Sequence, residues 1–214
     1  MHYSKLPFEN FVNKVDDVLG QSLTDQGLVS SMSSFGYGLK EMEQGRELLE
    51  AVRQIDQEQE AAQERRKELN RQRGDLHKNL QKRYMRIVKL GRIVFDDNEF
   101  AGKTLGLNGP REKQFDEWYR QVYMFCKNLI AETSWLDALK GFGVKRGDLD
   151  NILEDLEKLE ELNTRFEHAK NLSKEMTRKK KKKVMALQDW LSDYIKIARM
   201  ALEEKPQLLN KLLS

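Results

Sequence analysis

The residues best able to do chemistry lie in the stretch MTRKKKKKV, at 176–184, and their chemistry would be the binding of anions. The candidate site consists of Arg178, Lys179, Lys180, Lys181, Lys182 and Lys183. Six adjacent basic residues surround a helix rather than form one stripe, and they lack the interleaved aromatics of a single-strand binder and the apolar face of a membrane-surface helix. The run therefore favours a solvated helix face balanced by acidic neighbours, with an anionic partner as the alternative.

The histidines and the single cysteine could carry metal or nucleophilic chemistry, but both lack the partners that such chemistry requires. His2, His77 and His168 have no second ligand at the spacing of a metal site. Cys126 falls on an apolar, aromatic stripe without an assigned base, which is typical of a core cysteine rather than a nucleophile. We therefore predict no catalytic residue, no metal site, no cofactor and no small-molecule substrate, and hence a non-enzymatic protein.

The composition is typical of helices in water. Apolar residues make up 39% and charged residues 34% of the 214 residues, with three prolines, which provides a core but few strand-like runs. The net charge of +3 is too small to indicate a polyanion partner by itself. No stretch of about 18 apolar residues occurs, the N-terminus lacks the regions of a signal peptide, and one cysteine fits a reducing compartment. We expect a cytoplasmic location.

The elements that position these residues occur twice. A shift of 107 residues, half of the 214, aligns the two halves without a gap and sets Phe35-Gly36 on Phe142-Gly143. Identical residues are few, so the comparison depends on the apolar pattern. In that pattern Phe8, Phe11, Val15, Val18 and Leu19 align with Phe115, Trp118, Val122, Phe125 and Cys126. The sequence predicts an internal duplication, with helical repeats at 1–107 and 108–214 packed together as a single domain.

Each repeat is expected to contain the same helices. Apolar residues at i, i+3, i+4 and i+7 indicate a first helix, as at 115–130. A shorter helix follows and ends at Phe-Gly, because glycine permits the left-handed conformation of a helix C-terminus. A long helical stretch then covers about 40–97, and again about 148–204. The positions expected to be buried are Phe8, Phe11, Val15, Trp118, Val122, Cys126, Trp135 and Leu139.

Each long stretch is compatible with one helix or with a hairpin of two. Gly74-Asp75 favours a turn in the first repeat, whereas the aligned Lys181-Lys182 favours a helix. No glycine or proline interrupts the chain between Gly147 and Pro206. One heptad register contains Leu149, Leu156, Val184, Leu191 and Ala198. We favour the long helix, so the predicted fold class is all-α: an elongated, internally duplicated helical bundle with two long, coiled-coil-like helices.

Charge is sorted along both long stretches. Acidic residues predominate in 41–64 and 148–167, whereas basic residues predominate in 65–92 and 170–199. The helix macrodipole favours this order. It also allows antiparallel helices to set acidic segments beside basic ones, which gives the lysine run acidic partners within the chain.

The duplication, the segment YIKIARMAL from Tyr194 and the segment KPQLL from Lys205 resemble a group of uncharacterised bacterial all-helical proteins. The first repeat departs from this pattern, with NEFA from Asn98 where the second has KPQL. The group has no described activity, so the resemblance implies the fold and no functional residue. We expect a structural or protein-interaction role, with a protein partner or self-association. Binding of nucleic acid or an anionic membrane through the basic halves of the long helices is the alternative.

Overall fold

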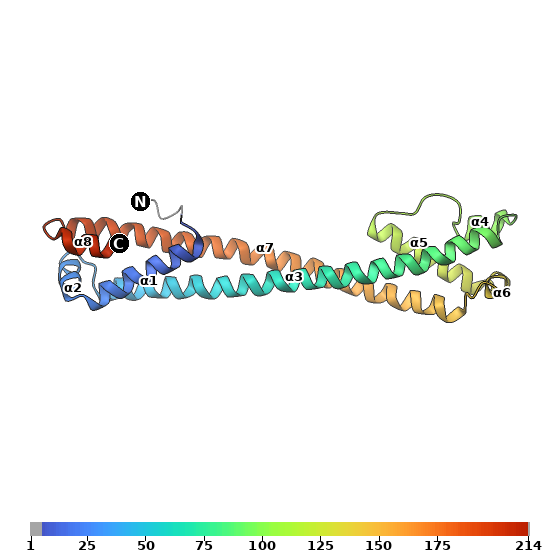
Figure 1. The fold of residues 1–214 in the computed structure, drawn as a ribbon, viewed down its shortest axis with the longest axis horizontal. Coiled ribbons are helices and arrows are strands. Elements are labelled where there is room, and N and C mark those ends of the chain that lie inside the picture. Colours follow the sequence, from blue (N-terminus) through green and yellow to red (C-terminus); the bar gives the residue numbers. More distant parts are fainter. Residues whose placement is uncertain (1–5, 214) are drawn as a thin grey trace. The chain divides into compact units, whose positions relative to one another are not determined.

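The computed structural model describes residues 6–213, which form helices and no strand, so the predicted all-α class is confirmed (Figure 1). The helices are α1 (Phe8–Thr24), α2 (Gln26–Ser33), α3 (Leu39–Val94), α4 (Glu99–Thr104), α5 (Phe115–Ala131), α6 (Thr133–Lys140), α7 (Arg146–Ala201) and α8 (Pro206–Leu213). The two long helices, α3 and α7, contain 56 residues each and pack together. Because Gly74 and Asp75 are helical, the single-helix alternative is confirmed and the hairpin is excluded.

Local side-chain chemistry fixes where the helices begin and end. A carboxylate in the first turn accepts a hydrogen bond from the backbone N–H just before each long helix, from Gly38 to Glu41 at 2.9 Å and from Lys145 to Asp148 at 2.8 Å. The short helices α2 and α6 end at Ser33 and Lys140, and the turns that follow them contain Gly36 (φ 81°) and Gly143 (φ 78°). Both glycines occupy the left-handed region that only glycine adopts without steric cost, as the Phe-Gly pattern predicts.

The chain packs as two compact units. Unit 1 contains the residues up to Glu64 and those from Asn171 onward, and unit 2 contains Arg65–Lys170. Unit 1 thus combines α1, α2, the first part of α3, the last part of α7 and α8. Unit 2 combines the rest of α3 and α7 with α4, α5 and α6. The predicted repeats, 1–107 and 108–214, therefore each contribute helices to both units.

Unit 1 has its own apolar core. Side chains on α1 and α2 pack against the apolar faces of α3 and α7, and Leu212 of α8 joins them. The fully buried members include Val15, Val18, Leu28 and Leu191. Residue numbers rise along α3 as they fall along α7, from the contact of Gly45 with Trp190 to that of Gln59 with Thr177. The two helices are therefore antiparallel in this unit.

Unit 2 has a separate core in which α5 lies on α3 and α7. Its buried side chains include Tyr84, Val122, Cys126, Leu129 and Leu156. Arg111 tethers the loop that follows α4, because its guanidinium donates to the Tyr84 hydroxyl at 2.6 Å and to the Gly106 carbonyl at 2.5 Å. The α3 and α7 segments of this unit are also antiparallel, as shown by Arg73 donating to Asn163 and Arg83 pairing with Asp155.

Most of the predicted core positions are buried. Phe11, Val15, Trp118, Val122, Cys126 and Leu139 are each no more than 2% exposed. Phe8 and Trp135 are only half-buried. Phe8 lies in the first turn of α1 and Trp135 in the first turn of α6, where each side chain has fewer helical neighbours to cover it.

Candidate functional site

The predicted anion-binding run lies on α7 in unit 1, and part of it is paired within the chain. Lys180 forms an ion pair with Asp56 of α3, and its ammonium lies 3.9 Å from the ring centroid of Phe8. Lys179 pairs with Glu175 one turn earlier, at 2.7 Å. The hydrogen bond between these groups lowers the pKa of Glu175 and raises the pKa of Lys179. Acidic neighbours therefore balance two of the basic groups.

The remaining members of the run are exposed. Arg178, Lys181, Lys182 and Lys183 form no ion pair with any residue between 6 and 213. Arg178, Lys181 and Lys182 share one helical face because they are spaced i, i+3 and i+4. That face points away from Met176 and Lys180, which lie against α3. These four side chains are available to solvent or to an anion.

Unit 2 contains a second basic surface, within the basic segment 65–92 of α3, whose groove and apolar lining the sequence did not indicate. It is an open groove of about 770 Å³ along the last part of α3. The groove is lined by Asn79, Lys82, Arg83, Met85, Arg86, Lys89, Leu90, Ile93 and Phe142. Four basic side chains and no acidic one belong to this lining. The spacing of Lys82, Arg86 and Lys89 places them on one helical face, but periodicity gives no sign of the groove, because Phe142 reaches it from outside α3.

One basic residue of the groove, Arg83, is paired with an acidic residue of the same unit. Arg83 pairs with Asp155 of α7, and Lys158 lies 3.1 Å from the same carboxylate. Burial alone would raise the pKa of Asp155, but the hydrogen bonds from Arg83 and Lys158 outweigh it and lower that pKa. Lys82, Arg86 and Lys89 are exposed and form no ion pair among the described residues. Their charge is therefore free to attract an acidic group.

Exposed apolar side chains accompany the groove's charge. Ile93 is 69% exposed and Phe142 is 50% exposed, although both are large hydrophobic residues. Leu90 and Met85 are half-buried along the same lining. Apolar side chains beside unpaired charges are typical of a surface that binds another macromolecule.

Two positions of unit 1 that lie 107 residues after basic residues of the groove carry the opposite charge. Asp189 and Asp193 occur where unit 2 has Lys82 and Arg86, and both are exposed. Asp193 forms an exposed ion pair with Lys196 at 2.8 Å. This surface of α7, which we call the acidic face, comprises Met185, Ala186, Asp189, Asp193, Lys196 and Met200.

Trp190 gives the acidic face a different shape from the groove. It occurs where unit 2 has Arg83, and its indole lies flat over Gly45 of α3. A Cβ built on Gly45 would come within 2.2 Å of the indole ring, and the indole N–H donates to the Glu41 carbonyl at 3.2 Å. The ring thus fills space beside α3 that a shorter side chain would leave open.

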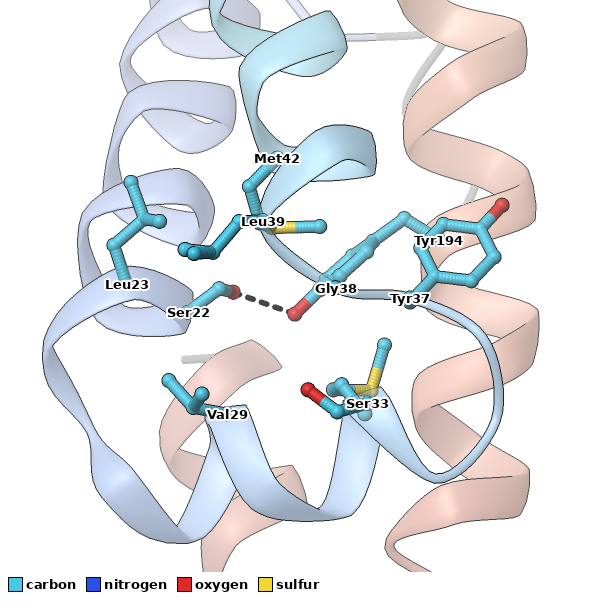
Figure 2. Close-up of a pocket in the computed structure, with 10 residues that line it drawn as sticks. Ser22, Leu23, Val29, Ser33, Tyr37, Gly38, Leu39, Met42 and Tyr194 are labelled. Carbon is cyan, nitrogen blue, oxygen red and sulfur yellow. Dashed lines mark hydrogen bonds between the residues drawn. The ribbon is translucent and has the colours of Figure 1, made fainter.

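A small enclosed pocket in unit 1 has a hydrogen-bonded polar pair beside it. Figure 2 shows that Ser22 of α1 and Tyr194 of α7 point toward each other, and their hydroxyl oxygens are 2.5 Å apart. Burial raises the pKa of Tyr194, so its hydroxyl remains protonated. The pocket volume of about 20 Å³ has room for about one water molecule. The arrangement therefore satisfies two buried hydroxyls and offers no room for a substrate.

Cys126 and His77 pack against core side chains. Cys126 is fully buried, and burial raises the pKa of its thiol to about 12, far from the range of a nucleophile. His77 is half-buried with its ring 4.3 Å from that of Trp118, and burial followed by the charge of Arg73 lowers its pKa. His168 is exposed. His2 lies outside the described residues.

The described residues contain neither a metal-binding group nor a membrane-spanning helix. Between residues 6 and 213, no group of three or more His, Cys, Asp and Glu side chains is arranged to hold a metal ion. Within the same residues, no helix is both long enough and apolar enough to cross a membrane. Comparison of the chain with protein-family models, with curated proteins and with solved structures gives no match.

Proposed function

We propose that this chain is a non-enzymatic structural or protein-interaction protein and that the groove of unit 2 is its principal docking surface. The observation that supports the proposal is the combination of unpaired basic groups with exposed apolar ones. Lys82, Arg86 and Lys89 have no acidic partner in the described residues, and they line the same groove as Ile93 and Phe142. Such surfaces are characteristic of docking sites for other proteins.

The chemistry of the groove favours an acidic, amphipathic protein segment. Carboxylates on such a segment can pair with Lys82 and Arg86, and its apolar side chains can cover Ile93 and Phe142. A phosphate backbone would use the charges alone and would leave the apolar side chains in water. The groove also lacks an acid–base pair for catalysis. Its lining contains no acidic residue, and Asp155 of α7 is already paired with Arg83. A binding role therefore accounts for more of the groove's side chains than a catalytic role.

Co-purification with a matched pair of variants tests this function. Lys82→Glu, Arg86→Glu and Lys89→Glu together reverse the groove's charge. Lys181→Glu, Lys182→Glu and Lys183→Glu produce the same change in net charge on the lysine run. We expect proteins captured from native lysate by the wild type to be retained by the lysine-run variant and lost by the groove variant. Equal capture by both variants, with circular dichroism showing both folded, would contradict the role of the groove.

The proposal includes an internal duplication, supported by the recurrence of local features. The helices α5, α6 and α7 begin and end 107 residues after α1, α2 and α3. The glycine ends of α2 and α6 and the carboxylate caps of α3 and α7 recur at the same interval. The pair of Lys180 with Asp56 and the hydrogen bond from Arg73 to Asn163 also fall on aligned positions.

A fragment experiment tests the duplication. Each unit takes helices from both repeats, so a fragment of residues 1–107 lacks the α7 segments that cover the apolar face of α3. If the repeats are equivalent, a second copy of the fragment can supply them. We expect fragment 1–107 to be helical only as a homodimer, measured by circular dichroism and sedimentation. A folded monomeric fragment would contradict the equivalence.

The alternative function is binding of an anionic surface, and one observation favours it. Arg178, Lys181, Lys182 and Lys183 are exposed without an ion pair among the described residues. Titration with labelled DNA, labelled RNA and anionic vesicles at two salt concentrations tests this role. Because a short basic run neutralises few phosphates, we expect negligible retention at about 150 mM salt. Retention at that salt which disappears on replacing Lys179–Lys183 with Gln would establish the alternative.

We also propose a cytoplasmic location and membership in the group of bacterial all-helical proteins that the sequence resembles. A lone cysteine, buried as a free thiol at Cys126, supports a reducing compartment. The long helices support the resemblance in fold, which carries no activity with it.

A further inference from the structure

We propose that a second copy of this chain occupies the groove, and that it does so with the acidic face of its unit 1. This inference rests on the proposed function, because it identifies the partner of the same groove. One copy would supply Lys82 and Arg86, and the other would supply Asp189 and Asp193. All four side chains are exposed, and Asp193 would exchange its exposed ion pair with Lys196 for one with the other copy. The two surfaces can therefore meet without rearrangement of either core.

The spacing of the opposite charges matches. Lys82 and Arg86 are four residues apart on α3, and Asp189 and Asp193 are four residues apart on α7. Residues at i and i+4 lie on one face of a helix, about 6 Å apart along its axis. Two ion pairs can therefore form together when one helix lies along the other. Complementary charge of this kind sets register and speeds association.

The neighbouring residues select the antiparallel direction. In that register Lys82 faces Asp193 and Arg86 faces Asp189. One turn further, Leu90 of the groove faces Met185, an apolar side chain that is 51% exposed in the single chain. The register thus places an apolar contact beside the two ion pairs. At the next position along this face, Ile93 faces Lys182, whose methylene stem can cover Ile93 while its ammonium stays in water.

The parallel direction is disfavoured by like charges. It would pair Lys82 with Asp189 and Arg86 with Asp193, and it would set Ile93 against Met200. It would also set Lys89 against Lys196. The antiparallel register instead sets Lys89 opposite the small Ala186 and Lys196 opposite Asn79. Opposed like charges destabilise a contact, so we expect the antiparallel arrangement.

The contact joins two different surfaces, so each copy carries both halves of it. Such a contact is heterologous: it either closes into a ring of copies or continues as a chain. Because charge dominates the contact, association should weaken by roughly tenfold between about 0.05 M and about 0.5 M salt.

Charge reversal on the full chain tests the proposal by sedimentation velocity. Variant A carries Lys82→Glu and Arg86→Glu, which makes both surfaces acidic. Variant B carries Asp189→Lys and Asp193→Lys, which makes both surfaces basic. We expect the wild type to self-associate, variants A and B to be monomeric when alone, and an equimolar mixture of A and B to associate again.

Restoration in the mixture separates docking from damage to the fold, because two misfolded variants would not recover together. A wild type that stays monomeric at about 0.1 mM protein and low salt would overturn the proposal, because the proposed contact requires a Kd below about 0.1 mM. Variants A and B that associate as strongly as the wild type would also overturn it. If the wild type is monomeric while the groove variant still loses a partner from lysate, the proposed function stands and only the second copy is excluded.

Cysteine cross-linking tests the direction. Because Cys126 is buried, introduced cysteines provide the accessible thiols. We expect a Lys89→Cys chain to form a disulfide with an Ala186→Cys chain under mild oxidation, and not with a Lys196→Cys chain. The reverse preference would overturn the antiparallel arrangement.

Discussion

Two glycines within α3 should respond oppositely to the same substitution. Gly45 lies beneath Trp190, and an added Cβ would come within 2.2 Å of the indole ring. Gly74 lies in the same helix with no atom within 4 Å of an added Cβ. The change from glycine to alanine is therefore the same in the helix backbone at both sites and differs only in what the new methyl group meets.

The magnitudes follow from these surroundings. Alanine stabilises a helix interior by about 1 kcal/mol relative to glycine, so Gly74→Ala should raise the free energy of unfolding by about that amount. At Gly45 the indole must move, although Trp190 is 8% exposed and stacks on Tyr194 at 5.5 Å. Overpacking costs about 1–3 kcal/mol, and a displaced indole loses the hydrogen bond to Glu41, about 1 kcal/mol more. After the helix gain, Gly45→Ala should destabilise by about 1–3 kcal/mol.

Thermal and urea unfolding followed by circular dichroism at 222 nm measure both variants. For a chain of this size each kcal/mol shifts the Tm by about 2–4 °C. Gly74→Ala should therefore melt about 2–4 °C above the wild type, and Gly45→Ala should melt several degrees below it.

A double variant checks that the ring is the cause. Gly45→Ala combined with Trp190→Leu should be less destabilised than the sum of the single changes, by about 1 kcal/mol or more, because leucine leaves room for the methyl group. A Gly45→Ala chain as stable as Gly74→Ala would refute the placement of Trp190 over Gly45. Additive effects in the double variant would refute the steric explanation.

Four further predictions concern the core and the charged run. Trp118→Ala should cost about 3–5 kcal/mol because the side chain is 2% exposed and donates to Gln81, whereas Trp135→Ala should cost less; an unchanged urea midpoint for Trp118→Ala would contradict its burial. The Cys126 thiol should resist iodoacetamide at pH 8 in the folded chain and react after unfolding, since its pKa is raised to about 12. The same shift should lower stability as the pH rises from about 9 toward 12, because the unfolded thiol then loses its proton while the folded one keeps it, and a Cys126→Ala chain should lack this component. Replacing Lys179–Lys183 with Gln should leave the chain helical and lower stability by at most about 1–2 kcal/mol, and a loss of helical signal would show that the run does more than balance its neighbours.

The sequence by itself determined the helices and most of the buried residues, because both depend on short-range patterns. Apolar residues repeating every three or four positions place Phe11, Trp118 and Val122 on buried helix faces. The left-handed glycines Gly36 and Gly143 lie in the turns that follow the short helices, where the Phe-Gly pattern indicates. These features need only neighbours within about one turn, so the chain specifies them before it packs.

Only the tertiary structure decided which segments share a core and which charges remain unpaired. Lys180, Arg178 and Lys181 belong to one run of basic residues. Lys180 pairs with Asp56, which is 124 residues away in the chain, whereas Arg178 and Lys181 pair with no acidic group among the described residues. Arg83 in the lining of the groove pairs with Asp155, whereas the aligned Trp190 covers Gly45. Periodicity identifies the face of a helix but not the side chain that another helix brings opposite it, and that pairing sets both the shape and the net charge of a surface.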